Sequence, residues 1–148
     1  MTTIDTLVRD TADTVRAIPL FAGIDVLEED KGDVSAKLDV AIARTKSVAA
    51  VVGWNGFVPK ISGRTAPEGS PFGEVTIVVQ LFERPAVNRR NDANPHLLHL
   101  AQAVAKEIDG ASSDGMEDEL RLKRISPVSE LDRGVITCDV EFTTKASL

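Results

Sequence analysis

The chain has 148 residues, of which 43% are hydrophobic and 27% are charged, and its formal net charge is −6. This length favours a single domain with a sizeable core, and the acidic balance argues against a general nucleic-acid binder, which needs a basic face to neutralise phosphates. Cys138 is the only cysteine, which excludes an internal disulfide and favours a reducing compartment. No apolar stretch approaches the ~18 residues of a membrane span and the N-terminus lacks a signal-peptide pattern, so we expect a protein that stays in the cytoplasm after synthesis.

The first predicted element is an amphipathic helix over residues 3–18, whose apolar residues recur on one face. It ends before Pro19, because the residue that precedes a proline is pushed out of helical angles. Residues 20–27 are apolar with a glycine inside, which fits either a turn or an edge strand. The acidic residues after them indicate a solvated loop that caps a second, shorter helix over residues 34–45.

Residues 48–54 are typical of a strand, and the Asn55-Gly56 dipeptide that follows is the one that best suits a tight β-hairpin turn. The pattern therefore predicts a return strand over residues 57–62. Pro59 places that strand at a sheet edge, because proline has no N–H to donate to a ladder.

Trp54 and Phe57 flank the predicted turn. They either pack within the hairpin or form an aromatic anchor at a contact between subunits, where tryptophan is enriched. Residues 63–73 are rich in glycine and proline, which predicts an extended loop. We expect this loop to order against a neighbouring protein, because long loops in compact domains are often functional.

The stretch GEVTIVVQLFERP, residues 73–85, is the predicted centre of the fold. Apolar residues fall on both of its alternating faces, so it is interpreted as a strand in the middle of a sheet, buried on two sides. A charged arm over residues 84–94 leads away from it. In this arm Arg84, Arg89 and Arg90 either belong to a solvated loop or pair with acidic side chains of an adjacent subunit.

A third helix is predicted to begin at Asn94-Pro95, an N-cap residue followed by a proline, and to end at Gly110. Its predicted buried stripe is Leu97, Leu98, Ala101, Val104, Ala105 and Ile108. His96 and His99 lie one turn apart, in reach of a shared metal ion, but no third ligand stands at helical spacing, so we predict no metal site.

Two strands are predicted near the end of the chain. Residues 120–128 form a strand cut short by its proline, residues 129–134 form a turn, and residues 135–144 show the clearest alternation in the sequence. The inward side chains of the last strand are Ile136, Cys138, Val140 and Phe142. Cys138 is therefore interpreted as a small core residue and not as a nucleophile.

Motifs of common catalytic chemistry are absent from the sequence. There is no glycine-rich phosphate loop, no paired-cysteine metal motif and no GxSxG nucleophile elbow, and both histidines lie on one predicted helix. We therefore predict a protein that is not an enzyme, without catalytic, metal-binding or cofactor-binding residues.

The order of parts over residues 74–144 carries a resemblance. The strand VTIVVQLFERPAVNRR runs into a basic arm, the helix HLLHLAQAVAKEIDG follows, and LRLKRISPVSELDRG leads into the strand VITCDVEFTT. This order resembles the small tail-terminator and tail-completion proteins of long-tailed bacteriophages and related prophage particles. The resemblance implies an α+β fold in which an N-terminal helix and a helix following the central strand pack on a mixed, mostly antiparallel sheet.

The same resemblance implies a structural protein of the virion tail that assembles in the host cytoplasm. Such proteins form a ring, usually a hexamer, that sits on the tail tube protein, stops tube growth and offers a surface to the head-side connector protein. DNA passes through the lumen without specific binding, and an acidic inner rim would let it pass without trapping it.

Two alternatives stay open. The first is a head–tail joining protein or a tail tube subunit of the same kind of particle, and the second is an unrelated small ligand-binding domain or enzyme. The candidate residues of a subunit or tube interface are Trp54, Phe57, Arg84, Arg89 and Arg90.

Overall fold

The computed structural model describes residues 3–29, 38, 47–59, 71–86, 88, 95–112, 118–131 and 134–147. Its elements in chain order are α1 (Ile4–Arg16), the short 3₁₀ helix η1 (Pro19–Phe21), β1 (Asp25–Glu28), β2 (Val48–Pro59), β3 (Phe72–Glu83), α4 (Leu97–Ile108), β4 (Arg121–Ile125), β5 (Ser129–Glu130) and β6 (Ile136–Ser147). Apart from Leu38, the predicted helix over residues 34–45 lies outside the described residues, as does most of the predicted loop over residues 63–73.

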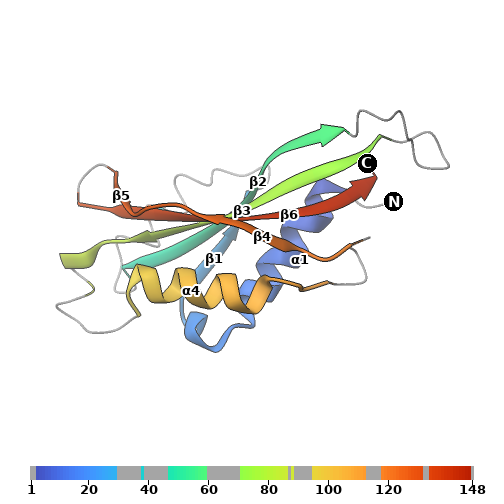
Figure 1. Ribbon diagram of the computed structural model, residues 1–148. Coiled ribbons are helices and arrows are strands. Elements are labelled where there is room, and N and C mark those ends of the chain that lie inside the picture. Colours follow the sequence, from blue (N-terminus) through green and yellow to red (C-terminus); the bar gives the residue numbers. More distant parts are fainter. Residues whose placement is uncertain are drawn as a thin grey trace.

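The six strands form one mixed sheet in the order β1-β2-β3-β6-β4, and β5 pairs with the start of β6. β1 runs parallel to β2, and the other described pairs are antiparallel. Both α1 and α4 lie on one face of this sheet, with α1 against β1 and β2 and α4 against β3, β6 and β4 (Figure 1). The predicted α+β fold is confirmed, with an N-terminal helix and a helix after the central strand on a mostly antiparallel sheet.

α1 forms where the sequence predicts it. The Thr3 hydroxyl caps the helix by accepting a hydrogen bond from the Thr6 N–H at 3.2 Å, and the apolar face buries Leu7, Val8, Ala12 and Val15. The helix ends at Arg16, two residues before the predicted end, and Pro19 begins η1. Residues 25–28 then form an edge strand, one of the two possibilities left open. No helix in the described part of the chain is long and apolar enough to cross a membrane.

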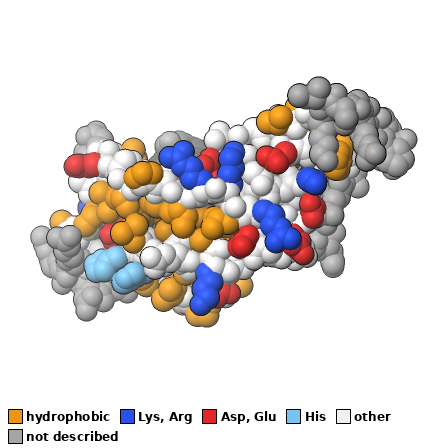
Figure 2. Space-filling view, viewed as in Figure 1, with side chains coloured by type: hydrophobic (Ala, Val, Ile, Leu, Met, Phe, Trp, Pro, Cys, Tyr) orange, Lys and Arg blue, Asp and Glu red, His pale blue; other side chains and the backbone are white. Residues whose placement is uncertain are grey.

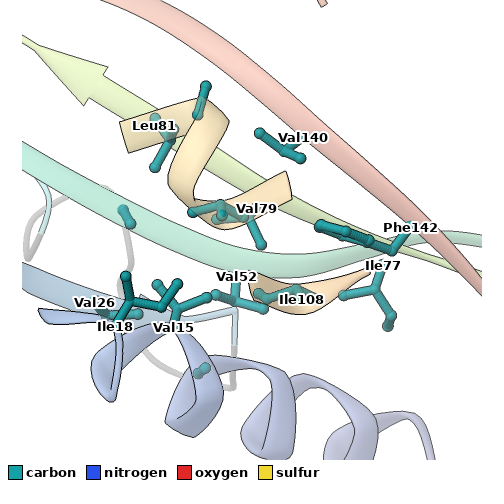
Figure 3. Packing of buried hydrophobic residues seen from close by; sticks show 14 of the residues in the cluster. Val15, Ile18, Val26, Val52, Ile77, Val79, Leu81, Ile108, Val140 and Phe142 are labelled. Carbon is teal, nitrogen blue, oxygen red and sulfur yellow. The ribbon is translucent and has the colours of Figure 1, made fainter. Parts of the chain in front are cut away.

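β3 is the central strand, as predicted, and it is buried on two sides. Val75, Ile77, Val79 and Leu81 are fully buried on the face that carries the helices, where they meet Val15, Val52, Ile108 and Phe142 (Figure 3). Phe82 on the opposite face joins a smaller cluster with Ala49, Val51 and Val135, against which Leu38 packs. Gln80, also on that opposite face, is exposed.

The predicted hairpin at Asn55-Gly56 is wrong. β2 runs straight through this dipeptide, and its pairing with β3 passes from Trp54↔Ile77 to Phe57↔Val75, so that two residues of β2 oppose one residue of β3. This is a β-bulge, and Gly56 adopts the positive φ of 108° that both bulges and turns demand. The dipeptide signals a change of backbone direction, but β3 offers a continuous partner, so the chain bends and does not reverse.

α4 begins two residues later than predicted, at Leu97, with His96 at the N-cap position and no side-chain capping bond. Its buried stripe contains Leu100, which is fully buried, and not Leu98, which is 54% exposed. The prediction for Leu98 is wrong because Leu97, Leu100, Ala101, Val104, Ala105 and Ile108 already follow the helical spacing, which turns Leu98 to one side. Gly110, at φ 85°, follows the helix end as predicted.

The predicted alternation in β6 is confirmed: Cys138, Val140 and Phe142 are fully buried, and Ile136 is half-buried. Cys138 is a core residue, whose Sγ lies 3.2 Å from the Ser126 carbonyl oxygen. β4 lies at the edge of the sheet beside β6, and the predicted turn over residues 129–134 contains the short strand β5.

Candidate interaction surfaces

Eight large hydrophobic side chains are exposed among the described residues: Leu20, Trp54, Val58, Leu98, Leu122, Ile125, Val128 and Leu131. Most of them lie on or near α4 and β4. In the register of the sheet, Leu122 is opposite Phe142 and Ile125 is opposite Val140, so both point to the face that carries the helices. The space-filling view shows a band of hydrophobic side chains between α4 and the strands above it (Figure 2). We define the α4–β4 strip as Leu98, Leu122, Ile125, Val128 and the half-buried Ile136.

One end of this strip is hollowed into a groove of about 450 Å³. The groove is lined by Glu83, Pro85, His96, Leu97, Leu98, His99, Val128 and Ile136. Its walls come from three places: the exit of β3, the start of α4 and the chain around β5. A groove of this kind is suited to an apolar side chain of a partner more than to a small polar ligand, because most of its lining is aliphatic.

A buried carboxylate lies in the groove lining. Glu83 is 2% exposed, and one of its oxygens accepts a hydrogen bond from the Asn88 side-chain amide at 3.1 Å. The His96 Nδ1 is 3.7 Å from the same oxygen, and the Asn88 amide also approaches the Pro95 carbonyl oxygen at 3.5 Å. These contacts hold the beginning of the charged arm against the entry to α4.

Two edges of the sheet are guarded against strand addition. At β1, the Arg16 guanidinium donates to the Val26 carbonyl oxygen at 2.8 Å. At β4, the Leu122 N–H donates to the Asp109 carboxylate at 2.9 Å, and just before it the Leu120 N–H donates to the Ala111 carbonyl oxygen at 2.9 Å. Occupied backbone groups disfavour pairing with a foreign strand, so contacts at these edges must rely on side chains.

A polar concavity of about 260 Å³ lies elsewhere, lined by Glu29, Gly53, Trp54, Asn55, Val78, Gln80 and Asp139. The Glu29 carboxylate lies against Gly53 and accepts a hydrogen bond from the Trp54 N–H at 3.2 Å. Burial raises the pKa of the Asp139 carboxyl, and the nearby Glu141 adds to the increase, whereas Gln80 and Arg124 oppose it. Within the described residues no three His, Cys, Asp or Glu side chains gather in a way that could hold a metal ion.

The residues named from the sequence as a candidate interface are not brought together. Trp54 is 43% exposed, whereas Phe57 is half-buried and packs against the main core. The Arg84 N–H donates to the Ser47 carbonyl oxygen at 2.8 Å, and its Nε is buried without a partner in the described part of the chain. Trp54 lies about seven residues along β2 from this point, which is roughly 20 Å. Arg89 and Arg90 lie outside the described residues.

The α4–β4 strip was not predicted from the sequence. Its signal was an excess of leucine at the start of α4, where Leu97, Leu98 and Leu100 cannot all point into one core. β4 gave a second signal, because RLKRI mixes aliphatic and basic residues in a strand at the sheet edge.

No family model matches the chain, and no curated protein gives a significant match. Among solved structures, the fold is similar to that of a chain in the structure of the virion of a native gene transfer agent particle. The TM-score is 0.54 at 15% sequence identity, and the match covers 93% of this chain and 92% of that chain. The likeness shows a shared fold across almost the whole of both chains.

Proposed function

We propose that this chain is a structural protein of a phage-like particle that forms a ring on the end of the tail tube. The ring stops tube growth and provides the surface to which the head attaches. The observation that supports this most is the full-length fold likeness to a chain of a gene transfer agent virion. The order of elements that resembles tail terminators points the same way, and no catalytic motif in the sequence competes with it.

The mechanism we propose is complementarity between surfaces, without chemistry. One face of the ring matches the end of the tube, so it binds there. The opposite face does not match a tube subunit, so addition stops. We propose that the exposed Trp54 and the arm carrying Arg84, Arg89 and Arg90 contact the tube or a neighbouring subunit, and that the ring is a hexamer. The net charge of −6 is consistent with a lumen that repels DNA.

A head–tail joining protein or a tube subunit is the second candidate. It is favoured by the same structural likeness, since the similar chain is described as part of a whole virion and not of its tail end. The two candidates differ in how they assemble. A tube subunit polymerises into long tubes on its own, whereas a terminator or joining protein stops at one closed ring.

Size-exclusion chromatography with light scattering, followed by negative-stain images of the same peak over a range of concentrations, tests this proposal. Closed rings with a central hole support it, and long tubes favour the tube subunit. A species that stays monomeric at every concentration and does not bind the end of tail tubes contradicts it. The triple variant Arg84→Ala, Arg89→Ala, Arg90→Ala is expected to bind tubes or neighbours more weakly with an unchanged circular dichroism spectrum, and unchanged assembly would remove these arginines from the interface.

A further inference from the structure

Each copy in the proposed ring must present two different surfaces, because a ring of identical subunits is closed by head-to-tail contacts. The α4–β4 strip is one apolar surface. A second one lies at the turn after α1, where Ala17, Pro19, Leu20 and Ala22 are all exposed around the buried Phe21. We define these four exposed residues as the η1 knob. Its most prominent side chain is Leu20, which is 45% exposed.

The two surfaces lie on different sides of α4. In the view of Figure 1, the blue turn that contains η1 lies below α4, and β4 lies above it. The sheet order agrees, since β1, which follows the knob, and β4, which carries the strip, are the two ends of the strand order. A subunit can therefore offer its knob to one neighbour and its strip to another.

The charges around the two surfaces are opposite. β4 contributes three exposed cations to the strip, Arg121, Lys123 and Arg124, and its only charged residues are basic. Arg121 is paired with Glu119 at 2.6 Å, which leaves Lys123 and Arg124 with the greater share of the positive charge.

Acidic residues border the knob. They are Asp13, Asp25 and Glu28, and the one cation among them, Arg16, is already shared between Asp13 at 2.8 Å and Glu28 at 3.2 Å. An acidic border with a single neutralised cation complements the basic border of the strip. Two strips facing each other would instead bring their cations together, which disfavours a symmetric dimer through this surface.

From these observations we infer that the η1 knob of one copy docks on the α4–β4 strip of the next copy, with Leu20 among the aliphatic side chains and the acidic border against β4. The inference rests on the proposed ring and names its subunit contact. Because the outward backbone groups at β1 and β4 are occupied, this contact is made by side chains and not by an added strand.

Disulfide trapping between engineered cysteines tests the pairing. Leu20→Cys and Ile125→Cys are made separately and mixed under mild oxidation at the concentrations used for assembly. We expect a covalent dimer in the mixture and none in either variant alone, because the contact joins two different surfaces. The native Cys138 is fully buried, so wild-type protein gives no background. Val58→Cys, 66% exposed on β2, is the matched control and is expected to cross-link with neither partner.

Association measurements give an independent readout. Leu20→Ser and Ile125→Ser are each expected to weaken self-association about tenfold or more, since each removes an aliphatic side chain from the contact, whereas Val58→Ser leaves it unchanged. Asp25→Lys and Lys123→Glu are each expected to weaken it several-fold, and mixing the two charge-reversed variants is expected to restore part of the loss.

The outcomes separate this inference from the proposed function. A covalent dimer formed by Ile125→Cys alone, or no mixed product at any concentration, overturns the pairing. If rings or tube caps are seen in the same samples, the proposed function stands and only the contact is wrong. Mixed product from a protein that never caps a tube supports the contact and contradicts the proposed function.

Discussion

The Glu83–Asn88 contact makes the most quantitative prediction. Glu83 is the one charged residue that is buried among the described residues, and it accepts a hydrogen bond from Asn88, which is 1% exposed. A hydrogen bond to a charged group contributes about 1.5–3 kcal/mol, and burial on both sides leaves little solvent to replace it. We expect Glu83→Ala and Asn88→Ala each to lower the free energy of unfolding by about 2–4 kcal/mol, since each leaves a buried polar partner unsatisfied.

The double variant separates this contact from general loss of packing. The two losses should not add, and the coupling energy from the double-mutant cycle is expected to be about 1.5–3 kcal/mol. Urea unfolding followed by circular dichroism measures all four free energies, provided that the slope against urea stays constant. Asp5→Ala removes an exposed carboxylate from α1 and is the control, with an expected change within about 0.5 kcal/mol. A coupling energy below about 0.5 kcal/mol would refute the contact as the anchor of the arm.

Three further predictions concern single side chains. The pKa of Asp139 is raised by burial, so above its ordinary value of 3.8 the unfolded chain releases a proton that the folded protein holds, and stability falls as the pH rises through the raised value. Asp139→Asn is therefore expected to raise the Tm at pH 7 relative to wild type, and a gain that persists unchanged at pH 3 would contradict this cause. Gly73→Ala is expected to cost about 1–3 kcal/mol in urea unfolding, because its Cβ would meet the backbone of β2 at Val58 and Pro59. Gly53→Ala would meet only the mobile end of Glu29, so its cost should be smaller and should disappear in a Glu29→Ala background. Burial also raises the pKa of the Cys138 thiol, and native protein should react with a thiol reagent about a thousandfold more slowly than urea-unfolded protein; equal rates would show that the strand is open.

Periodicity predicted the fold well where one face of an element is buried and the other is not. α1 and β6 show this, because their alternation or helical spacing matches the burial of Val15 and Val140. β3 was predicted from its continuous apolar run, which only a strand covered on two sides can tolerate. These signals are local, so one sequence is enough to detect them.

The bulge in β2 could not be predicted in the same way. Asn55-Gly56 permits a turn and a bulge equally well, and the choice is made by β3, which pairs with Val52 before the dipeptide and with Val58 after it. This is a long-range effect of the sheet. The site residues failed for a related reason: proximity in the sequence to a turn or an arm does not bring Trp54 and Arg84 together, because they lie at different positions along adjacent strands.

The α4–β4 strip depends on tertiary structure in the same sense. Leu98 belongs to a helix, and Ile125 belongs to a strand more than 20 residues later, so nothing in the local pattern joins them. The sheet order places β4 beside β6, and α4 packs across both strands. Only then does an aliphatic surface appear between them, with basic side chains on its border.

The central claim is that this protein ends tube growth, and the length of tubes measures it most directly. Tail tube protein of the same particle is polymerised alone and with increasing amounts of this chain, and tube lengths and tube ends are recorded in negative-stain images. The account predicts that the mean length falls as the chain is added and that a ring-shaped cap appears at one end of each shortened tube. Unchanged lengths with bare ends, or incorporation of the chain along the tube wall, would contradict it.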